Sequence, residues 1–465
     1  MPSEDDGAGR ARLVVTPALA NALGWGLRGQ FGGELGATVP GALTGLALAS
    51  ASGDPAVAAR AGRLGALGAF GFSFGGTETY GQTLALSHDS RLRERWYWWG
   101  LLGCAIKGGV WLGLGGGFLG IALGNRRHTP LHMLALGAVL SPLFELGVQL
   151  CNRPMEPPHR LPAIYFSNFH HPQDPQDPPR SEAWGGLGLG LLGVMGYLAL
   201  RRDWPALRLA AGGMLGGACG FAGGQAVQAA GNQPGRFPER VNRVADWWKA
   251  MEMTFGLVGG AGLGASCPDQ AGEGDPPLGA ANRAAARLSG LAAALILAGA
   301  LRERKWAWSL IEHPFSWGCL GMAAALGDDE LAWQWVLSGV LLTTTANVSR
   351  HWAQSGMEQY LRPLWAAALA LAGLGAWWAH LLADRDRARR QAATALGAVA
   401  WSQIALSQAK SLLNRDSLAL DRPEQAQLPL ARRVWQRHPG AVVTEGIFTV
   451  LGFALGALTA GRADQ

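Results

Sequence analysis

Apolar stretches of helix length alternate with short polar breaks along the whole chain. A hydrocarbon core needs about 20 mostly apolar residues, and the plainest stretches are Leu361 to Leu382, Leu288 to Leu301 with its flanks, and Trp98 to Gly124. This pattern predicts an all-α, multi-pass transmembrane helical bundle of about 12–14 segments, forming a single integral membrane domain over residues 1–465. The apolar stretches begin near residues 13, 34, 62, 97, 130, 183, 205, 247, 284, 313, 331, 362, 391 and 440.

One glutamate, usually followed by an aromatic residue, recurs at the predicted start of several segments. Such repetition predicts internal repeats, in which a helical hairpin is used about seven times. The carboxylates then form a ring at one end of the bundle. Helix capping is an alternative, because an acid in the first turn interacts favourably with the helix dipole and with free N–H groups. The recurring glutamates are Glu34, Glu182, Glu252, Glu312 and Glu445.

The polar breaks are of two kinds. One kind is short and arginine-rich, and the other consists mainly of longer loops at about 153–182, 232–246 and 414–439. Because positively charged loops favour the cytoplasmic side, we expect a protein of the cell membrane with a cytoplasmic N-terminus. The segment Arg302-Glu-Arg-Lys305 goes against this orientation, because it falls among the breaks assigned to the outside.

Glycines spaced four residues apart indicate close contacts between helices. Gly113 and Gly117, Gly116 and Gly120, and Gly256 and Gly260 follow this spacing within apolar stretches.

Composition favours a membrane protein. Charged residues make up 15% of the chain, below the roughly 25% of soluble proteins. The mean hydropathy of +0.11 is modest, so a soluble helical toroid remains an alternative to a membrane protein. We expect a lipid bilayer and a small polar solute as partners, and no nucleic acid, since the arginines form short clusters between apolar stretches. The five scattered cysteines favour neither a disulfide framework nor a zinc site, and we expect no metal or cofactor. The sequence does not indicate the oligomeric state.

The clearest local group of candidate binding residues lies in the segment Trp25-Gly-Leu-Arg28-Gly-Gln30-Phe-Gly-Gly-Glu34. It places an arginine, an amide and a carboxylate on a glycine-rich backbone between two apolar stretches. Broken helices of this kind hold substrates in transporters, because irregular backbone within a membrane is tolerated where it lines a cavity. The alternative is a tight turn in which Arg28 pairs with Glu34.

Charged residues also occur inside apolar stretches, where an isolated charge is costly. Glu78, Lys107 and Glu145 are such residues, and Glu78 and Lys107 lie on adjacent segments of one predicted hairpin. We therefore expect them to pair, either as a structural ion pair or as part of a site. The predicted substrate-binding set is Trp25, Arg28, Gln30, Glu34, Glu78, Lys107, Glu145, Glu252 and Glu445.

Together these features favour secondary transport of a small polar solute, with Trp25, Trp98 and Trp247 along the path. The alternative is a membrane-embedded, transferase-type enzyme acting at the extracytoplasmic face. Its acid/base candidates are then Glu312, His313, Arg350 and His351. Transport predicts that acids within segments matter most, whereas an enzyme predicts that polar residues in the loops matter most.

Overall fold

The protein is built from α-helices. The computed structural model describes residues 4–78, 80–88, 94–124, 126–157, 159–167, 179–268, 278–382, 388–413, 418 and 427–460. These residues form helices and no strand, apart from one isolated bridge between Glu156 and Arg160. The predicted all-α helical bundle is thereby confirmed.

Most long helices begin within four residues of the predicted starts, although α1 begins at Glu4 rather than near residue 13. The long helices are α1 (Glu4–Phe31), α3 (Thr38–Ala51), α5 (Ala61–Ser73), α7 (Glu94–Leu123), α8 (Pro130–Cys151), α9 (Trp184–Leu200), α10 (Trp204–Gly231), α12 (Trp247–Ser266), α13 (Ala280–Leu301), α15 (Trp317–Gly327), α17 (Val340–Gln354), α18 (Leu361–Leu382), α19 (Ala388–Leu412) and α21 (Pro439–Ala460).

Short helices fill several of the predicted breaks. A turn of π-helix, η2, joins α16 to α17, and the 3-10 turns η1 and η3 follow α5 and α17. The short elements are α2 (Gly33–Gly36), α4 (Pro55–Ala58), η1 (Phe74–Thr77), α6 (Gly81–His88), α11 (Glu239–Asn242), α14 (Lys305–Glu312), α16 (Asp329–Gln334), η2 (Trp335–Gly339), η3 (Glu358–Tyr360) and α20 (Leu430–Arg437).

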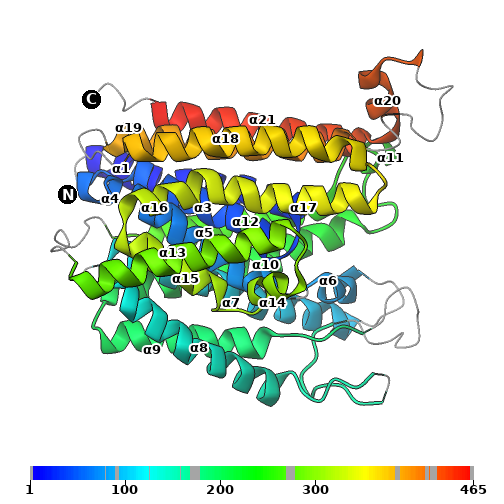
Figure 1. Ribbon diagram of the computed structural model, residues 1–465. Helices are drawn as coiled ribbons and strands as arrows, with labels where there is room; N and C mark the ends of the chain where they lie inside the picture. The colour runs from blue at the N-terminus through cyan, green and yellow to red at the C-terminus, as the bar shows by residue number, and fades with distance from the viewer. Residues whose placement is uncertain are drawn as a thin grey trace.

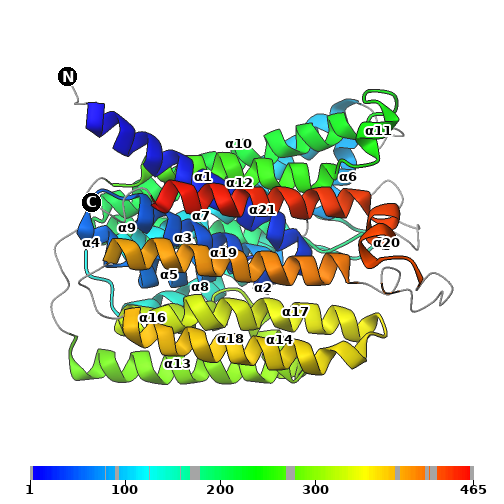
Figure 2. The same cartoon turned by 90° about the horizontal axis from the view of Figure 1, so that it is seen from above.

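The long helices run roughly alongside one another (Figure 1). Both chain termini lie at one end of the bundle, and α6, α11 and α20 lie at the opposite end, which we call the loop end. Seen from above, α13, α16, α17 and α18 gather along one side of the molecule (Figure 2). The internal repeats stay a prediction.

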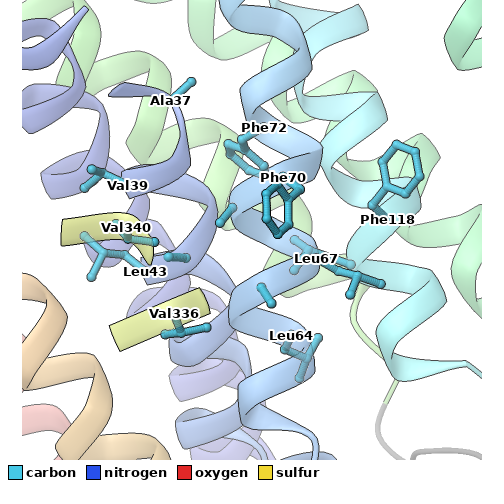
Figure 3. Packing of buried hydrophobic residues seen from close by; sticks show 14 of the residues in the cluster. Ala37, Val39, Leu43, Leu64, Leu67, Phe70, Phe72, Phe118, Val336 and Val340 are labelled. Atoms are coloured by element: carbon cyan, nitrogen blue, oxygen red, sulfur yellow. The ribbon is translucent and has the colours of Figure 1, made fainter. Parts of the chain in front are cut away.

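Buried aromatic and aliphatic side chains fill the space between α3, α5 and α7 (Figure 3). The Phe70 ring lies 5.0 Å from the Trp317 ring and 5.1 Å from the Trp335 ring, measured between centroids. Aromatic edge-to-face contacts of this kind stabilise a core beyond the area they bury. This packing joins α5 to α15 and to η2.

Glycines bring the inner helices into contact, as their spacing predicts. A Cβ on Gly116 would lie 2.4 Å from the Leu209 carbonyl oxygen of α10. Gly256 and Gly260 bring α12 against α1, where a Cβ would lie 2.4 Å from the carbonyl oxygens of Asn21 and Pro17. No larger residue fits at these positions without moving a helix backbone.

Among the helices that the structure describes, five are long and apolar enough to cross a membrane: Trp96–Leu123, Pro130–Cys151, Ala280–Leu301, Glu358–Leu382 and Pro439–Ala460. The first is almost wholly buried, whereas the other four are mostly uncovered. Their uncovered faces carry large apolar side chains, including Leu150, Leu288, Trp377 and Phe453, each at least 65% exposed. An apolar exterior on long helices is typical of a protein in contact with lipid.

Candidate functional site

Arg28 lies in an aromatic enclosure near the end of α1. Its guanidinium carbon lies 5.0 Å from the centroid of the Tyr80 ring, 5.2 Å from that of Trp111 and 5.9 Å from that of Trp25. The side chain donates a hydrogen bond to the Tyr80 hydroxyl. Arg28 is only 6% exposed, so cation–π contacts and this bond replace much of its hydration.

Tyr80 connects Arg28 to a buried carboxylate on α12. The Tyr80 hydroxyl donates to Glu252 Oε1 over 3.1 Å, and Trp248 Nε1 donates to the same oxygen over 3.0 Å. Lys249 Nζ lies 2.7 Å from Glu252 Oε2. We call Arg28, Tyr80, Trp248, Lys249 and Glu252 the Arg28 cluster. It holds two cations and one carboxylate, so it keeps a surplus of positive charge.

Gly29 makes this arrangement possible. A Cβ at this position would lie 2.0 Å from both Glu252 Oε2 and Lys249 Nζ. The ion pair therefore sits directly against the backbone of α1. The next residue, Gln30, contributes its carbonyl oxygen, which accepts a hydrogen bond from Lys410 of α19.

The chain breaks after α1, as the glycine-rich segment predicts. Gly32 and Gly33 have φ angles of 73° and 56°, a left-handed region that favours glycine. Arg28 bonds to Tyr80, not to Glu34 across a tight turn. Glu34 is half-buried in the break, and this burial raises the pKa of its carboxyl group. The negative charge of Glu312 raises that pKa further, whereas a hydrogen bond from its own backbone and the positive charge of Arg28 lower it.

A second charged cluster surrounds Lys107 of α7. Lys107 Nζ lies 2.7 Å from Glu182 Oε1, 2.8 Å from Thr83 Oγ1 and 3.4 Å from Glu78 Oε1. The predicted pairing of Glu78 with Lys107 is thus confirmed, although Glu182 is closer. Glu182 also accepts hydrogen bonds from Ser167 Oγ and from a backbone N–H. We call Glu78, Thr83, Lys107, Ser167 and Glu182 the Lys107 cluster; it is fully buried.

Capping does not explain the recurring glutamates on α12 and α21. Glu252 and Glu445 lie in the second turn of their helices, and Asp246 caps α12. Glu445 accepts hydrogen bonds from Ser407 and Ser411 of α19 over 2.7 and 2.8 Å. The predicted position of Glu312 at the start of a helix is wrong, because α14 ends there and α15 begins at Trp317.

Glu145 lies within the apolar stretch of α8, as predicted, but its side chain does not face the inside of the bundle. Its side chain is 58% exposed on α8 and lies 3.4 Å from His313 Nε2. An apolar stretch does not show which of its faces is covered, so the error arises from helix rotation. Trp98, predicted to line the path, is 61% exposed.

The predicted enzyme residues have separate partners. The His313 side chain pairs with Glu145, whereas the Arg350 guanidinium lies 5.0 Å from the centroid of the Trp308 ring. Glu312, Arg350 and His351 are exposed.

An open pocket of about 710 Å³ lies at the loop end, between the end of α10, α11 and the starts of α12 and α21. Trp248 lines it and also belongs to the Arg28 cluster, so the two are adjacent. Tyr80, Trp248 and Lys249 are not among the site residues predicted from the sequence. The three-residue spacing of Lys249 and Glu252, which places them on one helix face, was the one sequence feature that indicated their pairing. The polar lining includes Gln228, Asn232, Gln233, Asn242, Trp247 and Trp248.

The five cysteines all lie among the described residues, and none of them forms a disulfide. Within the part of the chain that the structure describes, no group of three or more His, Cys, Asp or Glu side chains is placed to hold a metal ion. The adjacent histidines His170 and His171, in the loop at about 153–182, lie outside the described residues. The chain matches no family model, and neither a curated protein nor a solved structure matches it.

Proposed function

We propose that this protein is a secondary transporter of a small polar solute and that the Arg28 cluster binds the solute. The observation that carries the proposal is a set of buried charges inside an apolar-faced bundle, adjacent to an open pocket at one end. We further propose that it resides in the cell membrane with a cytoplasmic N-terminus.

The cost of the buried charges supports a binding role. Removing ions from water costs several kcal/mol per ion, and buried ion pairs seldom increase stability over an apolar core. Ionisable groups inside a membrane bundle therefore suggest a site by default. In the Arg28 cluster, one carboxylate serves two cations, Arg28 through the Tyr80 hydroxyl and Lys249 directly.

The chemistry of the cluster suits a small polar solute. Arg28 and Lys249 supply donors, Glu252 supplies an acceptor, and the tryptophan and tyrosine rings exclude water around them. A solute that enters past Trp248 meets Glu252 first, because Trp248 Nε1 bonds to that carboxylate. The enzyme alternative lacks comparable support, since Glu312, Arg350 and His351 are exposed and the described partners of His313 and Arg350 differ.

Membrane fractionation followed by uptake into proteoliposomes tests the proposal. Uptake by the full chain is compared with uptake by its Glu252→Gln variant, using a panel of labelled sugars, amino acids, carboxylates and phosphate. We expect at least one solute to be taken up and Glu252→Gln to lose that uptake, because the neutral amide no longer balances Arg28 and Lys249.

Glu330→Gln is the matched control. Glu330 lies near the surface, 3.4 Å from His380, and its variant should keep full uptake. Recovery of the protein in the soluble fraction without detergent would contradict the membrane premise. A membrane protein that takes up no member of the panel would contradict transport of these solute classes.

A further inference from the structure

The loop-end pocket carries amide groups and tryptophan rings. Gln228, Asn232, Gln233 and Asn242 contribute the amides, and among the described residues no lysine or arginine lines the pocket. Its one carboxylate, Asp246, accepts a hydrogen bond from the Lys249 backbone as the cap of α12. Amides both donate and accept hydrogen bonds, as hydroxyl groups do, whereas a charged ligand needs an opposite charge.

Gln228, which lines this pocket, carries an acceptor oxygen that no other group of the protein uses. The residue is 3% exposed, and its Oε1 atom has no hydrogen-bond partner. A buried acceptor left unsatisfied costs about 1–3 kcal/mol. This oxygen is itself enclosed, so a ligand hydroxyl would donate to it, and remove the cost, once the amide turns toward the pocket.

The tryptophan rings supply flat apolar surfaces that are held in place. Trp248 is 37% exposed, while its Nε1 bonds to Glu252. Trp247 Nε1 lies 3.3 Å from Asn242 Oδ1, and its ring packs 4.9 Å from that of Phe237. Trp247 packs against Phe237 and Gly231, whereas the exposed part of the Trp248 ring is open to the C–H groups of a ligand. Such a surface suits an amphipathic ring such as a sugar.

We infer that the loop-end pocket binds a neutral, hydroxyl-rich solute, a sugar or polyol, before it reaches the Arg28 cluster. The inference deepens the proposed function and rests on it for the direction of travel, but the binding itself is independent of transport. The pocket volume of about 710 Å³ lies within the 300–1,000 Å³ typical of small-molecule sites. The bond from Trp248 to Glu252 connects the pocket to the cluster.

Calorimetric titration of the purified full-length protein in detergent tests this solute class. The probes are neutral monosaccharides, disaccharides and polyols, compared with sugar phosphates, sugar acids and inorganic phosphate. We expect at least one neutral probe to bind at least ten times more tightly than its charged analogue. Equal or tighter binding of the charged probes, or no binding of any neutral probe, would overturn the inference.

Two variants locate the binding. Gln228→Leu removes the unsatisfied oxygen, so we expect at least tenfold weaker binding and an equal or higher Tm. Trp248→Phe should also weaken binding, whereas Trp204→Phe should not, because Trp204 starts α10 at the opposite end of that helix. A purely structural Gln228 would instead show a lower Tm with unchanged binding, which would overturn the assignment to this pocket.

Uptake by the same protein separates the two proposals. If a neutral probe binds and Gln228→Leu weakens it, but proteoliposomes take up nothing, the pocket inference stands and the transport proposal fails. If a charged solute is taken up and Gln228→Leu has no effect on it, transport stands and the pocket inference fails.

Discussion

The Arg28 cluster and the Lys107 cluster are built from similar groups but differ in their charges and in their access to the open pocket. Lys107 pairs with two carboxylates and donates to a hydroxyl, and Glu182 accepts two further hydrogen bonds. In the Arg28 cluster, Glu252 alone faces both cations. Each cluster leaves buried atoms without a hydrogen-bond partner, Arg28 Nε in one and both carboxylate oxygens of Glu78 in the other. Trp248 of this cluster reaches the open pocket.

This difference indicates which buried charges stabilise the fold and which are available to a solute. A group enclosed on all sides cannot reach a solute unless the structure opens. A cluster next to an open pocket can accept another ligand at lower cost. We therefore assign a structural role to the Lys107 cluster and solute binding to the Arg28 cluster, and the following variants test that division.

Lys107→Met should have the largest effect on stability. It leaves Glu78 and Glu182 buried without their cation, and breaking a buried ion pair costs about 3–5 kcal/mol. Thermal unfolding of the purified protein measures the loss, with Lys305→Met, an exposed lysine at the start of α14, as the control. An unchanged Tm combined with lost uptake would reverse the assignment of the two clusters.

Arg28→Lys should have the next largest effect, on uptake rather than on stability. Lysine keeps the charge but lacks the planar guanidinium that lies among the Trp25, Tyr80 and Trp111 rings. We expect at least a tenfold loss of uptake, equivalent to about 1.4 kcal/mol. Exposed Arg362 provides the control, Arg362→Lys. Full uptake by Arg28→Lys would show that Arg28 acts only as a charge.

Gly29→Ala should reduce uptake several-fold, because the added methyl group displaces the Lys249–Glu252 pair. Gly196→Ala in α9 is the matched control, since its Cβ would meet no atom within 4 Å. That control should increase stability by roughly 0.5–1 kcal/mol, the usual advantage of alanine over glycine in a helix. Equal uptake by both variants would argue against a role for the ion pair.

Thr83→Val should have the smallest effect. It removes the hydroxyl that accepts a 2.8 Å hydrogen bond from Lys107 Nζ but keeps the shape of the side chain. We expect a loss of about 1 kcal/mol in stability and unchanged uptake. Reduced uptake at unchanged Tm would place the Lys107 cluster on the solute path.

The sequence by itself determined the helices and several of their contacts. The starts of the long helices follow from apolar stretches of spanning length, and the close approach of α12 to α1 follows from the spacing of Gly256 and Gly260. The pairing of Glu78 with Lys107 also follows, because a charge within an apolar stretch needs a partner and these two lie on adjacent segments.

Only the tertiary structure decided which faces of the helices meet. Tyr80 bonds to Glu252 across 172 positions of sequence and so joins it to Arg28, and Trp248 turns its ring to a pocket made by three other elements. Glu145 is exposed although it occupies an apolar stretch as Glu252 does. The physical reason is that sequence spacing fixes positions along a helix, whereas the rotation and neighbours of that helix depend on the packing of the whole bundle.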